Sequence, residues 1–135
     1  MTQKPFLEVK NLNVAFPTED GLVQASNDIS FTVARGETLA VVGESGSGKS
    51  VTSLAVMGLH DRKRTQITGQ AFLNLETGPV DVISADEEVV RKLRGKAMSM
   101  IFQDPMSALH PYYSIGNQLI EAWSLYNEGD KTAGK

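Results

Sequence analysis

The sequence has 135 residues, of which 41% are hydrophobic and 21% charged, with a net charge of −3 and a pI near 5.3. This length fits one domain of modest size. The absence of cysteine excludes disulfides and thiolate metal sites, and the acidic balance gives no global attraction to nucleic acid or anionic lipid. Residues 1–5 lack the apolar core of a signal peptide, and no run approaches the roughly 20 apolar residues that span a bilayer. We therefore expect a cytoplasmic chain without a nucleic-acid partner.

The first third of the chain alternates apolar and polar residues, which is typical of strands with one solvent-exposed face. Short strands are predicted at 7–10, 12–16, 22–25 and 29–33, with a turn at 17–21. The next segment, 38–42, is short, apolar and partly β-branched, which predicts a strand buried on both faces of a parallel sheet. The sequence thus predicts an antiparallel meander that leads into a parallel strand.

Residues 43–50 match the pattern G-x-x-x-x-G-K-[ST], a loop whose main-chain N–H groups surround nucleotide phosphates. The eight positions are Gly43, Glu44, Ser45, Gly46, Ser47, Gly48, Lys49 and Ser50. The strand predicted before the loop and the helix predicted after it, at 51–59, give the order that such a loop requires. The alternative is a flexible Gly/Ser loop with an incidental lysine, which these flanks disfavour. We predict that the chain binds ATP or GTP.

The residue types of this loop suit a polyphosphate. A helix N-terminus offers unpaired N–H groups and a favourable dipole. Gly43, Gly46 and Gly48 are expected to adopt positive φ, so that successive amides converge on one anion. Lys49 is predicted to contact the β- and γ-phosphates, and the Ser50 hydroxyl to ligate Mg²⁺.

The remaining sequence alternates helix and strand signals. Strands are predicted at 66–75, 80–83 and 98–102, the last of them buried, and helices at 84–93, with Ser84 as N-cap and Glu87 at N3, and after Ser114. The last helix has apolar positions at the 3.6-residue period, namely Ile115, Leu119, Ala122, Trp123 and Tyr126. His60 and His110 stand alone and are interpreted as loop or surface residues. From residue 127 the chain is polar.

Three segments together resemble the N-terminal part of an ATP-binding cassette subunit, of the type that energises bacterial oligopeptide or dipeptide importers. They are 36–50, with the phosphate loop, 91–95, and 100–106, Met-Ile-Phe-Gln-Asp-Pro-Met. The resemblance covers nearly the whole chain, and the last segment is the most family-specific. It implies an α/β fold, that of a P-loop NTPase, with an antiparallel β subdomain at 1–37, a core at 38–126 that runs through the Q-loop into a helical subdomain, and a polar tail at 127–135.

The resemblance also implies roles for three residues outside the phosphate-loop pattern. Phe16 occupies the place of an aromatic that stacks on adenine; packing within the meander is the alternative. Gln103 matches the Q-loop glutamine, which approaches Mg²⁺ while its loop contacts permease subunits. At Val51 many cassette proteins carry a hydroxyl residue near the α-phosphate, so here only the main-chain N–H remains to contact it.

The family's signature segment, the strand ending in Asp-Glu and the switch histidine do not occur after Gln103. Without those carboxylates Mg²⁺ and the attacking water are not oriented. The sequence is therefore interpreted as a fragment of an ATPase that binds nucleotide with Mg²⁺ but does not turn it over. The resemblance implies that the intact subunit pairs with a second ATP-binding subunit and lies on the inner face of the cell membrane through permease subunits.

Three alternatives remain open on the sequence alone. The first is a small stand-alone GTPase or nucleotide kinase in which Asp104 follows a strand at 98–102 and binds Mg²⁺. The second is a cassette ATPase without a transporter, acting in DNA repair or translation. The third is an interaction surface at 105–123 with exposed aromatics, Tyr112, Tyr113 and Trp123, although their spacing favours a core position.

Overall fold

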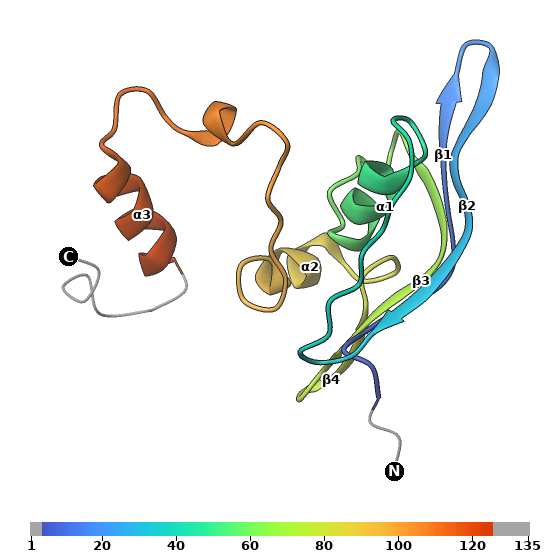
Figure 1. Ribbon diagram of the computed structural model, residues 1–135, viewed down its shortest axis with the longest axis horizontal. Helices are drawn as coiled ribbons and strands as arrows, with labels where there is room; N and C mark the ends of the chain where they lie inside the picture. The colour runs from blue at the N-terminus through green and yellow to red at the C-terminus, as the bar shows by residue number, and fades with distance from the viewer. Residues whose placement is uncertain (1–3, 126–135) are drawn as a thin grey trace. The chain divides into compact units, whose positions relative to one another are not determined.

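The computed structural model describes residues 4–125, and the chain divides into two compact units, Met1–Arg91 and Lys92–Lys135. The first unit holds β1 (Leu7–Thr18), β2 (Gly21–Val33), α1 (Lys49–Val56), β3 (Gln66–Leu75) and β4 (Gly78–Asp81) (Figure 1). Helix α2 (Glu87–Leu93) follows β4, and the second unit contains the 3₁₀ turn η1 (Pro105–Ala108) and α3 (Ile115–Ser124). No helix among residues 4–125 is both long and apolar enough to cross a membrane.

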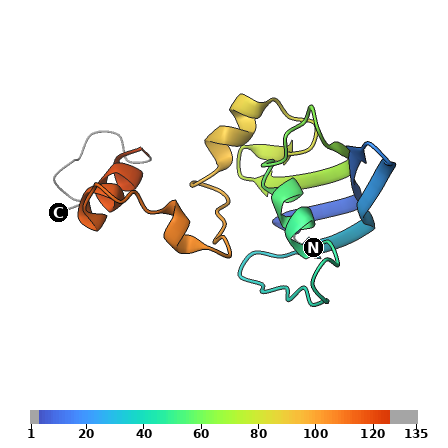
Figure 2. The same cartoon turned by 90° about the horizontal axis from the view of Figure 1, so that it is seen from above.

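The first unit is built on a four-stranded antiparallel sheet with the order β2-β1-β3-β4. The short strands predicted in the first third join into two long ones, β1 and β2, which pair as far as Thr18 and Gly21, so the turn is shorter than the predicted 17–21. β3 pairs with the other edge of β1, and β4 completes the sheet (Figure 2). This sheet also contains β3 and β4, so it includes residues beyond position 37, where the antiparallel β subdomain was predicted to end. The predicted domain boundary there stays a prediction.

The apolar core of the first unit is small and comes mainly from β1 and β3. Its buried side chains are Val9, Leu12, Val14, Ala15, Ala55, Ala71, Leu73, Val82 and Val90. Helix α1 contributes Ala55 and contacts both β1 and β2. In Figures 1 and 2 α1 lies against one face of the sheet. The loop that precedes α1 is therefore anchored through this helix.

Two predictions of buried strands, the parallel strand at 38–42 and the strand at 98–102, are wrong in this structure. Residues 38–42 are irregular, with Val42 90% exposed, and in 98–102 Ile101 is 92% exposed and Met98 forms an isolated bridge with Arg94. A parallel strand needs a neighbour on each side and helices over both faces. Among residues 4–125 all four strands belong to the antiparallel sheet, so neither apolar segment has such neighbours.

The two predicted helix caps have different outcomes. Ser114 is the N-cap of α3, and its hydroxyl accepts a hydrogen bond from the Asn117 N–H at 3.3 Å, as predicted. Ser84 is not the N-cap, because α2 begins only at Glu87 and the N–H groups of Val89 and Val90 donate to the Asp86 carbonyl. The Ser84 hydroxyl donates to the Asp81 carboxylate at 2.8 Å.

In the second unit the apolar positions of α3 do not face a core. Within the described residues the helix buries none of its side chains, and Ile115 and Leu119 are exposed; Tyr126 lies outside the described residues. Tyr112 is 90% and Tyr113 61% exposed, so the interpretation of these two tyrosines as core is wrong here, whereas Trp123 is half-buried. Gln118 organises the preceding loop: its Nε2 donates to the carbonyls of His110 and Tyr113, at 3.1 and 2.9 Å.

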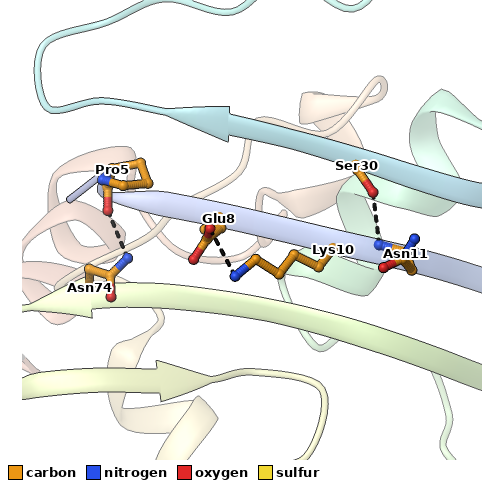
Figure 3. Close-up of polar contacts among 6 residues, drawn as sticks. All are labelled: Pro5, Glu8, Lys10, Asn11, Ser30 and Asn74. Carbon is orange, nitrogen blue, oxygen red and sulfur yellow. Dashed lines mark hydrogen bonds and ion pairs between the residues drawn. The ribbon is translucent and has the colours of Figure 1, made fainter. Parts of the chain in front are cut away.

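Hydrogen bonds from polar side chains surround a bulge in β1. The pairing with β2 shifts register between Val9 and Leu12, and Asn11 has a φ of 47°. The Asn11 N–H donates to the Ser30 hydroxyl at 2.9 Å (Figure 3), and its side-chain amide donates to the Asp28 carboxylate at 2.6 Å. These contacts replace ladder hydrogen bonds that the bulge removes. Nearby, Figure 3 shows the Asn74 amide bonded to the Pro5 carbonyl, which ties the chain before β1 to β3.

Asn11→Ala is expected to lower the free energy of unfolding by about 1–3 kcal/mol, because it removes the bond to Asp28 and places an alanine in left-handed backbone. Asn11→Gly is the matched control, since glycine adopts this φ freely and loses only the amide, which should cost about 1 kcal/mol. Urea denaturation of both variants measures the difference. Equal losses would show that the backbone conformation at Asn11 contributes nothing.

Candidate functional site

The segment 43–50 forms a tight loop that ends in α1. Gly46 and Gly48 have φ of 80° and 89°, and Gly48 is the N-cap residue. The Ser47 N–H donates to the Glu44 carbonyl at 3.2 Å, and the Thr52 N–H donates to the Gly48 carbonyl at 2.9 Å. The loop therefore makes one turn before the helix starts at Lys49. The first N–H groups of α1 have no partner within the helix, which is the usual basis of an anion site.

At two positions of the loop, Gly43 and Gly48, a side chain would not fit. Gly43 does not have positive φ, contrary to our prediction. A Cβ at Gly43 would instead lie 2.6 Å from the Ser47 hydroxyl oxygen, so a side chain there would collide with the loop. A Cβ at Gly48 would collide with the Ala25 carbonyl oxygen of β2. The end of the phosphate loop is thus packed against the sheet, in addition to requiring left-handed backbone.

The Lys49 side chain folds back across this loop. Its Nζ donates to the carbonyls of Gly43 and Glu44 at 2.6 and 2.7 Å, and to the Ser47 hydroxyl at 3.1 Å. All three partners are uncharged, so they position the ammonium group without cancelling its charge. A phosphate oxygen would form a stronger, charge-assisted bond with the same group. The loop therefore presents a cation and helix N–H groups together, and these residues fit a polyphosphate.

The neighbouring predicted residues differ in exposure. Ser45 and Ser50 are exposed, Val51 is half-buried, and Glu44 is exposed with its carbonyl bonded to Lys49. The Ser50 hydroxyl is in the first turn of α1, where an oxygen ligand for a cation that bridges phosphates is needed. Among residues 4–125, no three His, Asp or Glu side chains gather into a metal-ligating group. Mg²⁺ binding by Ser50 stays a prediction.

Phe16 lies near the end of β1, opposite Val23 of β2, and is half-buried. Its ring makes an edge-to-face contact with His60, with centroids 5.6 Å apart and planes at 71°. His60 in turn contacts α1, since its Nε2 is 2.8 Å from the Val51 carbonyl oxygen. The sequence indicated a loop position for His60 but gave no sign of these contacts, because no spacing pattern links residues so far apart in the chain.

Gln103 and Asp104 belong to the second unit. Both are exposed, and Asp104 directly precedes η1, where its carbonyl accepts a hydrogen bond from the Ser107 hydroxyl at 2.9 Å. Phe16 and the phosphate loop belong to the first unit, so the role of Gln103 beside them stays a prediction. The alternative of a small GTPase needs a strand immediately before Asp104, and residues 98–102 do not form one.

The sequence pattern of the family described as "ABC transporter" matches residues 26–133. The oligopeptide transport ATP-binding protein OppD of Haemophilus influenzae is 45% identical over 127 residues, which cover 94% of this chain and 38% of that protein. OppD of Escherichia coli is 46% identical over 125 residues, covering 93% and 36%. A putative peptide import ATP-binding protein of Brucella ovis is 46% identical over 123 residues, covering 90% and 36%. The chain thus spans less than two fifths of the length of these relatives.

A solved structure has a similar fold. It is described as the dimeric structure of a post-hydrolysis state of the ATP-binding cassette MJ0796 bound to ADP and Pi, and it matches with a TM-score of 0.71 at 18% identity. The match covers 92% of this chain and 49% of that one. It confirms the predicted fold class, an antiparallel sheet with helices from the N-terminal part of an ABC ATPase. Since the family pattern covers most of its length, the chain belongs to the ABC transporter family.

Proposed function

We propose that this chain supplies the phosphate-binding half of an ATP site in an importer subunit that couples ATP hydrolysis to the uptake of peptides or similar small solutes. The observation that carries the proposal is the Lys49 ammonium, held across the loop by three uncharged oxygens at the start of α1. The relatives named for oligopeptide transport and peptide import support the solute class.

In this proposal each residue of the loop has a distinct task. Main-chain N–H groups of 44–51 donate to phosphate oxygens, and Lys49 exchanges its carbonyl partners for the β- and γ-phosphates. The Ser50 hydroxyl holds Mg²⁺, which neutralises charge on the phosphates when it is bound. Because Val51 has no hydroxyl, one hydrogen bond of roughly 0.5–1.5 kcal/mol is missing, which weakens binding without preventing it.

The remaining functions need groups beyond this loop. Positioning and electrostatic stabilisation provide nearly all of phosphoryl-transfer catalysis, and residues 4–125 contain no cluster of metal-ligating carboxylates. We infer that the chain by itself binds ATP without turnover, and that hydrolysis needs the carboxylates of the intact subunit and a second ATP-binding subunit. Gln103 and its loop face permease subunits, which hold the complete protein on the cytoplasmic side of the membrane.

Titration calorimetry of the 135-residue chain with ATP tests the proposal. We expect saturable binding at one site, strengthened by Mg²⁺ and displaced by inorganic tripolyphosphate, which carries the same charges without a base. GTP serves as a comparison, because the site has no element that reads guanine. An absence of heat with both nucleotides, on a chain that is folded by circular dichroism, would refute the site.

Phe16→Ala is expected to weaken ATP binding by about 1–3 kcal/mol, the usual contribution of a base stacked on an aromatic ring. Phe72→Ala is the matched control: Phe72 is also a half-buried phenylalanine of the sheet, but it lies on β3 with Lys10 above its ring. Both variants lose stability, whereas only the first should lose affinity in calorimetry. Equal ATP affinity of Phe16→Ala and the unmodified chain would leave Phe16 with a packing role alone.

A further inference from the structure

We propose that His60 is a positioning residue that orients the Phe16 ring for the adenine base. This inference rests on the proposed function, because it assigns His60 a task only if Phe16 stacks a base. It goes beyond that function in naming a residue outside the phosphate loop that sets base affinity. The juxtaposition that carries it is one imidazole in contact with both the end of β1 and the first turn of α1.

The hydrogen bond to Val51 fixes the orientation of the imidazole. A carbonyl oxygen only accepts, so the His60 Nε2 at 2.8 Å must carry the proton and donate. With that nitrogen held, the ring meets Phe16 at 5.6 Å and 71°, within the geometry that aromatic pairs prefer. Val51 directly follows Ser50. The orientation of Phe16 is thereby linked to the helix turn that would hold the phosphates.

Packing alone does not hold the imidazole. His60 lines a hollow of about 160 Å³ together with Ala55, Gly58, Arg62 and Ile67. The two specific contacts of the ring are the bond to Val51 and the edge-to-face contact with Phe16, and we infer that these decide its position. Removing either contact would leave the imidazole free to move into the hollow.

Phe16 gains from such support because it is only half-buried. An unsupported ring would lose conformational freedom when a base stacks on it, and that loss lowers affinity. An edge-to-face contact occupies at most one face of the Phe16 ring, so it does not by itself exclude a base from the other face. His60 thus pre-organises the platform without blocking it.

A double-mutant cycle tests the inference. Calorimetry measures ATP and tripolyphosphate affinities of the chain, of His60→Ala, of Phe16→Ala and of the double variant. We expect His60→Ala to weaken ATP by about 2- to 10-fold, the range of an aromatic pair. Tripolyphosphate affinity should not change, and His60→Ala should cause no further loss in the Phe16→Ala background. His110→Ala, which removes the other histidine from the second unit, is the matched control and should bind ATP like the unmodified chain.

The outcomes separate this inference from the proposed function. If Phe16→Ala weakens ATP and His60→Ala does not, only the positioning role of His60 is refuted. An equal loss for tripolyphosphate, or the same loss with and without Phe16, would also refute it, since His60 would then act through the fold of the loop. If ATP does not bind, or if Phe16→Ala binds it unchanged, the adenine platform and this inference fail together. Should His60→Ala not fold, His60→Gln replaces it, because it keeps a donor for Val51 and removes the ring.

Discussion

Lys49→Ala is expected to reduce ATP binding to an undetectable level in calorimetry. The variant removes the ammonium group that three loop oxygens hold in place. Each charge-assisted hydrogen bond contributes about 1.5–3 kcal/mol, so two phosphate contacts amount to about 3–6 kcal/mol. A loss of this size exceeds what the remaining N–H groups of the loop are able to offset. The same titration with tripolyphosphate should show an equal loss, because in our proposal Lys49 contacts the phosphates and not the base.

The control for Lys49→Ala must remove the same charge from elsewhere on the first unit. Lys63→Ala does so, since Lys63 is exposed in the loop after α1. The hydrogen bond from Lys63 to the Asp61 carboxylate comes from its main-chain N–H, so the variant retains it. We expect this variant to bind ATP with unchanged affinity. If Lys49→Ala binds ATP as tightly as Lys63→Ala, the assignment of 43–50 as the phosphate site is wrong, whatever nucleotide the chain binds.

Features that depend on neighbouring residues were predictable from the sequence. The glycine pattern at 43–50 predicted the loop and a following helix at 51–59, and the structure begins α1 two residues earlier, at Lys49. Alternation predicted the strands of the first third. It predicted two separate strands at 7–10 and 12–16, whereas in the structure β1 continues through the bulge at Asn11 as one strand. Both signals are local, because turn chemistry and alternation act over a few residues.

Features that depend on distant partners were not predictable. The apolar run at 38–42 indicates a buried strand, but an apolar composition does not supply the neighbouring strands that would bury it, and Val42 is 90% exposed. At Ser84 the local pattern predicts a helix cap, but α2 begins two residues later than predicted, after Asp86. The contact between Phe16 and His60 joins two elements that no sequence period relates.

The second large effect is expected for Gly48→Ala, which should lower both the stability of the first unit and its affinity for ATP. Gly48 has a φ of 89°, a conformation that costs an alanine about 1–2 kcal/mol. In addition, the new Cβ would collide with the main-chain oxygen of Ala25. Ala25 has paired residues on both sides, Gln24 and Ser26, so its carbonyl oxygen is held by the sheet and α1 or β2 must shift. We expect a total loss of about 2–4 kcal/mol in the free energy of unfolding.

Gly46→Ala separates the two causes of this loss. Gly46 has a similar φ of 80°, but a Cβ there would have no atom within 4 Å. This variant should therefore show only the conformational cost of about 1–2 kcal/mol. Thermal and urea denaturation of both variants measure the difference, which reports how firmly β2 supports the end of the phosphate loop. If the two variants lose equal stability, the packing of Gly48 against Ala25 contributes nothing, and the loop is shaped by its own backbone alone.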